Sequence, residues 1–377
     1  MVTTGRRLAA YGLVAVLAAA AAGCRGDRGS DLEDSRARPP KQSDVTPKGD
    51  VSTPTGTPST PPSAPHEPVT IAFAGDLHFE GVLASRLTGS GPAIGPLGAR
   101  LARADLAIVN LETAVTNRGS PEPKDYVFRD PPAVFEALKA AGVDVVTMAN
   151  NHGLDYGPAS VPDALRAARR AGLPVIGLGK DAEQAYRPWV TTVNGQRIAF
   201  LAATAVVDSS LVDSWSARDN QAGVATALDG DNAALVDAIK AVRPHVDTVV
   251  VDMHYGSDLM ACPTDIQREV VRDVVRAGAD VVVGQHAHVL LGGGYQGSAY
   301  VHYGLGNFQF YSAGGATAET GVLMVTALGR EITEPRWFPG VVVNGLPTPL
   351  TGGAAKTATD RWVKLRSCTG LTARPAS

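Results

Sequence analysis

The chain has 377 residues, of which 34 are basic and 37 acidic, so its formal net charge is −3. Apolar residues make up 44% and charged residues 19%, which is typical of a folded globular protein and not of a disordered polyelectrolyte. The balanced charge argues against a dedicated nucleic-acid binder, which needs concentrated Lys and Arg for phosphate contacts. No apolar run of about 18–20 residues is followed by a stop-transfer pattern, so no membrane-spanning helix is expected.

The first 24 residues have the pattern of an export leader. Arg6 and Arg7 precede a short Ala-rich apolar stretch, Leu8–Ala22, which ends in small residues. The ending Ala21-Ala22-Gly23-Cys24 resembles a bacterial lipobox, in which the cysteine is lipidated and becomes the new N-terminus. We therefore expect an extracytoplasmic protein held on the cell membrane by a lipid anchor on Cys24. An ordinary cleaved leader with an incidental cysteine is the alternative.

Residues 25–68 are dominated by proline and small polar residues. Nine of these 44 residues are Pro and eleven are Ser or Thr. Such a segment cannot bury enough apolar surface to offset its ordering entropy, so its composition predicts a disordered tether. In a polyproline-like conformation it would reach on the order of 100 Å.

The rest of the chain alternates short apolar runs with amphipathic stretches. In chain order we expect strands at Val69–Ala74 and Leu106–Val109, a helix at Pro132–Ala141, a strand at Val143–Met148, a helix at Ser160–Ala171, a strand at Thr248–Val251, a helix at Ile266–Ala277 and a strand at Asp280–Val283. Gly142, Gly172 and Gly278 are expected to end the three helices. Such alternation predicts an α/β fold, either a sandwich or a doubly wound sheet.

The C-terminal part has a different pattern. Gly321–Leu328 and Arg336–Gly345 are expected to be consecutive antiparallel strands at one edge of the fold. We therefore predict one domain over residues 69–345. Residues 346–377 then form a tail that packs on the domain or trails it.

Polar residues with metal-binding side chains follow each of the five central strands. They are found in Gly75-Asp76-Leu77-His78, Asn110-Leu111-Glu112, Asn150-Asn151-His152, Asp252-Met253-His254-Tyr255-Gly256 and Gly284-Gln285-His286-Ala287-His288. Five of the eight histidines of the chain lie in these segments. Because ligand sites of open α/β sheets lie beyond the carboxyl ends of the strands, we expect these side chains to meet in one crevice.

The spacing within these segments supports a metal site. Asp76 and His78, and likewise His286 and His288, are two residues apart, so in extended chain each pair points to the same side. Mixed carboxylate, imidazole and amide ligands suit Mn, Fe, Zn or Co better than Ca or Mg. For any single pair, a surface histidine or a satisfied core histidine is the ordinary alternative.

The order of these motifs resembles the calcineurin-like metallophosphoesterase superfamily, and within it the bacterial capsule-synthesis protein CapA family, which is linked to poly-γ-glutamate biosynthesis. The segments that carry the resemblance are Phe73–Asp76, Asn110–Thr113, Ala149–Gly157, His254–Gly256 and Tyr303–Phe308. It covers Val69 to Gly345, nearly the whole folded part. The implied fold is a four-layer α/β/β/α sandwich of the metallo-dependent phosphatase type, with antiparallel strands at its C-terminal end.

The resemblance also implies roles for individual residues around two divalent metal ions. Asp76, His78 and His288 would hold the first ion, and Asn151, His254 and His286 the second, with Glu112 as the bridging carboxylate. His152 would be the nearby general acid. Two such ions can share a hydroxide and bind both oxygens of an in-line phosphoryl displacement. Glu112 departs from the Asp that is common among phosphoesterases, although CapA-like chains share this Glu.

Several further residues have two interpretations each. Asp155 either orients His152 or caps the helix after Gly157. Asn307 either contacts substrate or stabilises the turn at 304–306. Arg129 either meets an anionic substrate or is solvated, and Asn150 and Tyr255 are further candidates for the substrate side.

Two cysteines remain after Cys24. In an oxidising envelope, Cys262 and Cys368 are a candidate disulfide that ties the tail to the site loop.

Two functions from different classes follow from this reading. The first is a di-metal hydrolase or transferase that acts on a phosphoester or on an anionic cell-envelope polymer such as poly-γ-glutamate. The second is a non-catalytic accessory that binds the polymer through metal and serves an integral-membrane synthase or export complex. A complete ligand set together with His152 favours chemistry, because binding alone does not require an acid at this place.

Overall fold

The computed structural model describes residues 66–89, 91–228 and 231–376. The expected leader, the lipidation site Cys24 and the tether up to residue 65 lie outside the described residues. Among the helices that are described, none combines the length and the apolar character needed to cross a bilayer.

Two β-sheets form the centre of the fold. The first contains, in spatial order, β18 (Leu346–Pro349), β17 (Glu331–Val343), β16 (Glu319–Leu328), β1 (Val69–Leu77), β2 (Leu106–Leu111), β5 (Val145–Thr147) and β6 (Val175–Ile176), with β15 (Asn307–Gln309) also pairing with β1. Within this sheet β1, β2, β5 and β6 run parallel, whereas β16, β17 and β18 add an antiparallel edge. The antiparallel C-terminal strands expected from the sequence are therefore confirmed.

The second sheet has six strands, in the order β13 (Gly293–Gln296), β14 (Ala299–His302), β12 (Val281–His286), β11 (Thr248–Tyr255), β9 (Gln196–Thr204) and β8 (Trp189–Val193). Its four inner strands are parallel, and β8 and β13 run antiparallel at the two edges. Two small ladders lie outside the main sheets: β3 (Ala114–Val115) pairs with β4 (Arg129–Asp130), and β7 (Leu178–Gly179) pairs with β10 (Gly223–Val224).

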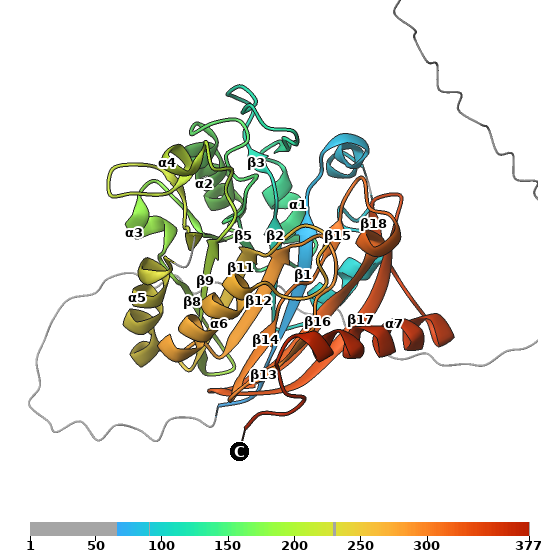
Figure 1. Cartoon of the computed structure of the whole chain (residues 1–377). Helices are drawn as coiled ribbons and strands as arrows, with labels where there is room; N and C mark the ends of the chain where they lie inside the picture. The colour runs from blue at the N-terminus through green and yellow to red at the C-terminus, as the bar shows by residue number, and fades with distance from the viewer. Residues whose placement is uncertain (1–65, 90, 229–230, 377) are drawn as a thin grey trace, which may run out of the picture. The chain divides into compact units, whose positions relative to one another are not determined.

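Helices cover the outer face of each sheet, and the two inner faces pack on each other (Figure 1). The first sheet carries α1 (Val134–Ala140) and α2 (Ser160–Ala171), and the second carries α5 (Ala233–Val242) and α6 (Asp265–Ala277). The short helices α3 (Ala182–Ala185) and α4 (Val212–Trp215) lie in connections. The fold is therefore the expected four-layer α/β/β/α sandwich.

The side-chain alternation of a strand explains these layers. In β1, Ile71 and Phe73 join the apolar layer between the sheets, together with Phe200 and Val250 of the second sheet. The intervening Ala72 joins the layer beneath α1 and α2. Successive strand residues point to opposite faces, so one strand serves two cores.

The C-terminal tail packs on the domain. Within it, α7 (Gly352–Leu365) lies against β17, and Trp362 stacks on Trp337 with ring centroids 5.4 Å apart. Trp362 Nε1 also donates a hydrogen bond to Nε2 of the buried His302, at 2.8 Å.

Four of the strands that lead to the expected site run further than their apolar patterns, whereas β5 (Val145–Thr147) is shorter than the expected strand Val143–Met148. β1 continues to Leu77, β2 to Leu111, β11 to Tyr255 and β12 to His286. The apolar pattern stops earlier because the last residues of each strand are polar. They remain extended because neighbouring strands still pair with them, as Asp76 does with Asn110 and Asn307. The expected helix ends agree, since Gly172 and Gly278 have φ of 62° and 119°.

Candidate metal centre

The site lies at the carboxyl ends of strands from both sheets. The first sheet supplies Asp76 from β1 and Glu112 directly after β2. The second supplies His254 from β11 and His286 from β12. Asn151 and His152 follow β5 in the first sheet. The five segments expected from the sequence therefore come together, as the placement of ligand sites in α/β sheets predicts.

Three overlapping groups of side chains could each hold a metal ion. They are Glu112, His254 and His286; Asp76, Glu112 and His288; and Asp258, His286 and His288, with the candidate ligand atoms of each group within 4.8 Å of one another. Glu112 belongs to the first two groups, as a bridging carboxylate would.

Glu112 gives the clearest sign that a cation belongs here. Its side chain is fully buried, and neither carboxylate oxygen has a hydrogen-bond partner. Burial, followed by the charge of Asp76, raises the pKa of Glu112 well above its ordinary value. A buried carboxylate without donors is costly, and divalent cations would offset that cost. The residues present thus fit the metal ions that the resemblance implies.

Asp76 is held by main-chain and amide donors. Its Oδ1 accepts from Asn110 Nδ2 at 2.7 Å, and its Oδ2 accepts from the His286 main-chain N–H at 3.0 Å. The His288 Nδ1 atom lies 3.5 Å from the same carboxylate. This hydrogen bond from His286 ties β1 of the first sheet to β12 of the second, which fixes the two halves of the site relative to each other.

His254 lies close to two other expected ligands. Its Nε2 is 2.7 Å from Asn151 Oδ1 and 3.4 Å from Glu112 Oε1. Burial lowers the pKa of His254 to about 3, so the ring is neutral at pH 7 and can act as a ligand. His254 therefore lies next to Asn151, expected at the same ion, and next to Glu112, the expected bridging carboxylate.

His78 differs from the other expected ligands. The Glu80 main-chain N–H donates to its Nδ1 at 3.0 Å, and its buried Nε2 has no partner. The ring stacks on Phe128 at 4.7 Å and meets Phe310 edge-on at 4.4 Å. Among the described residues, His78 is absent from all three metal-binding groups. Its role as a ligand stays a prediction.

His152 is oriented by Asp155. The His152 Nδ1 atom is 2.5 Å from Asp155 Oδ2, and that oxygen also accepts the Phe128 main-chain N–H at 2.7 Å. Asp155 is not a helix cap, because α2 begins only at Ser160 and Ala159 at its N-cap makes no side-chain bond. Of the two interpretations open for Asp155, the contact with His152 is the one that the structure contains.

The ionisation of this pair follows from burial. Burial lowers the pKa of His152 well below its ordinary value and raises the pKa of Asp155 to about 7. Lys124 opposes the second effect, since its Nζ lies 2.9 Å from Asp155 Oδ1. Lys124 also donates to the Asn151 main-chain carbonyl, which links the His152 orientation to an expected ligand.

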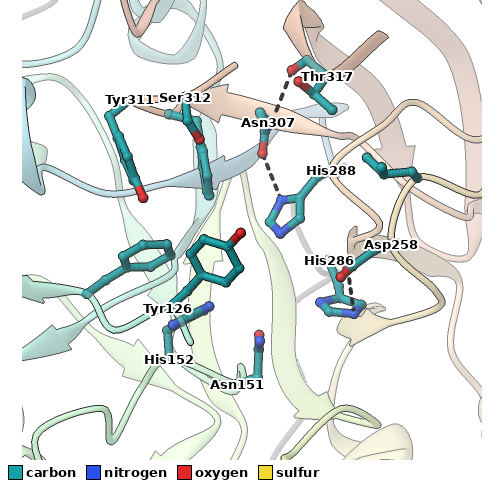
Figure 2. A pocket seen from close by; sticks show the side chains of 13 residues that line it. Tyr126, Asn151, His152, Asp258, His286, His288, Asn307, Tyr311, Ser312 and Thr317 are labelled. Atoms are coloured by element: carbon teal, nitrogen blue, oxygen red, sulfur yellow. Dashed lines mark hydrogen bonds and ion pairs between the residues drawn. The ribbon is translucent and has the colours of Figure 1, made fainter. Parts of the chain in front are cut away.

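Two adjoining cavities open beside these residues. One of about 300 Å³ has an aromatic wall, and Figure 2 shows how His152, Asn151, His286 and His288 lie around it with Tyr126 and Tyr311. The other, of about 540 Å³, is more polar and extends past Lys124 and Asp208. Both cavities are lined by Tyr126, Asn151, His152, Asp258 and His286.

The four candidates for the substrate side lie in different places. Asn307 lines the smaller cavity, where its Oδ1 is 2.8 Å from His288 Nδ1. Asn150 is buried and donates to Asn110 Oδ1 and to the Leu111 carbonyl, and Tyr255 is fully buried. Arg129 is exposed and lies over the ring of Tyr156 at 4.2 Å. Of the four, only Asn307 is among the residues that line the two cavities.

Two contributors, Lys124 and Asp258, were not predicted from the sequence. Asn110 was expected in the crevice without a role of its own, and the structure shows that it donates to Asp76. Lys124 and Asp258 lie in connecting loops without a pattern, and only the tertiary fold brings them to the site. The cysteine pair expected from the sequence is joined in the structure, where Cys262 and Cys368 form a disulfide with Cα atoms 5.7 Å apart.

Comparison with known proteins identifies the family of this chain. The family model described as bacterial capsule synthesis protein PGA_cap matches residues 70–312, a span that includes the assembled residues from Asp76 to Asn307. The chain belongs to this family.

Curated relatives carry related names. The chain is 34% identical over 176 residues to PGA biosynthesis protein CapA of Bacillus subtilis (strain 168), a match covering 46% of this chain and 44% of that protein. It is 27% identical over 226 residues to capsule biosynthesis protein CapA of Bacillus anthracis, covering 60% and 54%. It is 31% identical over 192 residues to probable polyglutamine synthesis accessory protein Rv0574c of Mycobacterium tuberculosis (strain ATCC 25618 / H37Rv), covering 49% and 50%. The chain thus spans about half the length of these relatives.

Proposed function

We propose that this PGA_cap family member takes part in the synthesis of a capsule or of poly-γ-glutamate, as a metal-dependent hydrolase or transferase outside the cytoplasm. Family membership and the names of the relatives support the process. The observation that supports the chemistry is the buried, unpartnered Glu112 carboxylate between two groups of candidate metal ligands. The substrate is proposed to be a phosphoester or an anionic cell-envelope polymer.

The ligand set supports two divalent ions, drawn from Mn, Fe, Zn or Co. Asp76 and His288 would hold one ion, with His78 as a further expected ligand, and Asn151, His254 and His286 would hold the other. Glu112 would contribute to both. Such ions supply Lewis acidity and activate water for attack on a phosphoryl or acyl centre.

His152 is proposed to move the proton at the leaving group. It borders both cavities, and its Nδ1 contact with Asp155 leaves Nε2 as the atom that exchanges a proton with substrate. An anionic substrate in the cavity would favour the protonated ring over the neutral one. Asp155 and Lys124 keep the ring in this orientation.

Metal content is the first test of this proposal. The purified wild-type chain, prepared without chelator, should contain close to two transition-metal ions by mass spectrometry. Glu112→Ala should lose most of this metal, because it removes the carboxylate that both groups share. Glu136→Ala removes an exposed carboxylate in the first turn of α1, outside the three groups; it is the matched control and should keep the metal. Fewer than half an ion in the wild type after reconstitution with Mn or Zn would refute the di-metal proposal.

A binding role without turnover is the second candidate, because the Mycobacterium tuberculosis relative is named as an accessory protein. Such a protein would serve an integral-membrane polymer synthase. Turnover of bis(p-nitrophenyl) phosphate or of poly-γ-glutamate by the wild type, reduced by about 10²–10⁴ in His152→Ala at unchanged metal content, would support catalysis. Metal-dependent polymer binding without turnover would support the accessory role.

The proposed location depends on Cys24. Lipid attachment there would retain the chain in the membrane fraction of its bacterial host. Cys24→Ser should therefore abolish incorporation of radioactive palmitate into the chain during growth of the host. Equal labelling of the wild type and the variant would contradict the lipid anchor.

A further inference from the structure

A loop between β11 and α6 brings a carboxylate to the metal centre. Asp258 Oδ1 lies 3.3 Å from His286 Nε2, a contact drawn as a dashed line in Figure 2. The Asp258 side chain is 68% exposed, so it reaches the histidine from the solvent side of both cavities. The opposite ring nitrogen, His286 Nδ1, is buried and has no hydrogen-bond partner.

The main chain holds this loop against the histidine segment. The Leu259 N–H donates to the Ala287 carbonyl at 2.9 Å, between the two histidines of the segment. Four residues beyond Asp258, Cys262 forms the disulfide with Cys368. A hydrogen bond at the next residue and a covalent link three residues further on therefore restrict where the Asp258 carboxylate can move.

Backbone strain is concentrated at the same contact. Leu259, His286 and His288 have φ values of 61°, 89° and 55°, in the left-handed region that non-glycine residues rarely adopt. They are three of the six such residues in the described part of the chain. Strain of this kind persists where the surroundings enforce it, commonly at functional sites.

We propose that Asp258 is a positioning residue of the metal centre, which accepts the Nε2–H of His286 and so presents the His286 Nδ1 lone pair to the metal ion. A neutral imidazole carries one proton, so fixing it on Nε2 leaves Nδ1 as the ligand atom. Histidine ligands of metal ions commonly donate their other N–H to a carboxylate, which sets the ring orientation and raises the basicity of the ligand. The inference rests on the proposed metal centre and adds a residue to it.

The test measures cobalt binding by the full purified chain. CoCl₂ is titrated into chelator-treated protein, and the visible absorption spectrum reports both affinity and coordination. Asp258→Ala should weaken Co²⁺ binding by about 10–100-fold at one site, the usual effect of losing such a partner. Asp258→Asn should recover most of that loss, because its amide oxygen can still accept the Nε2–H. Asp237→Ala, which removes an exposed carboxylate on α5, is the matched control and should bind as the wild type does.

Each other outcome rejects the inference in a distinct way. Wild-type affinity and spectrum in Asp258→Ala would show that the contact does not act on the metal. An Asp258→Asn variant as weak as Asp258→Ala, with a changed spectrum, would make Asp258 a direct ligand instead. If the wild type itself binds no Co²⁺, the proposed metal centre fails first, and this inference fails with it.

Discussion

Lys124 joins two parts of the candidate site, Asp155 and Asn151, to the core residue Trp215 through one buried ammonium group. Its Nζ lies 2.9 Å from Asp155 Oδ1, donates to the Asn151 carbonyl and lies over the Trp215 ring at 5.1 Å. Only 8% of its side chain is exposed. The charge of Lys124 is therefore largely shielded from water and salt, unlike the charges of the surface lysines.

Replacing Lys124 should destabilise the fold, because the buried Asp155 carboxylate depends on its charge. Lys124→Met leaves the buried Asp155 carboxylate without its cation and should lower the free energy of unfolding by about 3–5 kcal/mol, as measured by urea denaturation. Lys180→Met, which breaks an exposed pair with Asp181, should cost no more than about 1 kcal/mol. The double variant Lys124→Met/Asp155→Asn should recover part of the lost free energy of unfolding, because no buried carboxylate is left unpaired. Equal stability of the two lysine variants would contradict this account.

At the level of elements, a close contact between β1 and the segment before β15 sets the position of Asp76. A Cβ atom added at Gly75 would lie 1.8 Å from the Gly306 carbonyl oxygen, and the Asp76 N–H donates to that same oxygen at 3.0 Å. The two segments can approach this closely only because residue 75 has no side chain. The contact places Asp76 beside Asn307, its partner in the ladder.

Gly75→Ala should therefore disturb both stability and metal binding. The clash is with main chain, so relief requires a shift of β1 or of the 304–306 turn, at the upper end of the roughly 1–3 kcal/mol that overpacking costs. Co²⁺ affinity should fall as well, because Asp76 moves. Gly314→Ala is the matched control, since a Cβ there meets nothing within 4 Å and its φ of −162° is extended. Thermal unfolding and cobalt titration of both variants provide the check.

The candidate metal ligands that directly follow an apolar run could be predicted from the sequence. The positions of Asp76, Glu112, Asn151, His254 and His286 after strands were predictable, because parallel strands bring their carboxyl ends to one edge. The ends of β1, β2, β11 and β12 were placed too early, since polar ligand residues continue the pairing without an apolar pattern. The two-sheet arrangement came from the family resemblance, as periodicity alone also allows a single doubly wound sheet. Loop contacts such as that of Asp258 depend on long-range packing and leave no local signal.

For the molecule as a whole, α7 is attached to the sandwich through a buried histidine. His302 is fully buried, and its ring centroid lies 5.7 Å from that of Trp362 and 6.1 Å from that of Trp337. Its Nε2 accepts the Trp362 Nε1–H. Burial lowers the pKa of His302 to about 3. A histidine of the unfolded chain has a pKa of about 6.5.

This difference gives the stability a defined pH dependence. Because the pKa of His302 is lower in the folded state, its contribution is complete above about pH 6.5 and is lost as the pH falls toward 3. In that window the unfolded chain binds a proton at His302 that the folded chain does not bind. Each unit by which the pH falls therefore lowers the free energy of unfolding by about 1.4 kcal/mol. The slope of unfolding free energy between pH 6 and pH 5, measured in chelator, should be smaller by about this amount in His302→Gln. Identical slopes would contradict the assignment, whatever the absolute stability of the variant.

The chain returns to its first sheet only near its C-terminal end, which determines when that sheet can be completed during synthesis. Val69 pairs with Ala327 and Phe73 with Leu323, so the first five residues of the central strand β1 gain their second neighbour only when β16 has been made. In a nascent chain that ends before residue 319, one edge of β1 would be unpaired from Val69 to Phe73, however much of the second sheet the chain contained. Completion of the fold therefore waits until most of the polypeptide has left the ribosome.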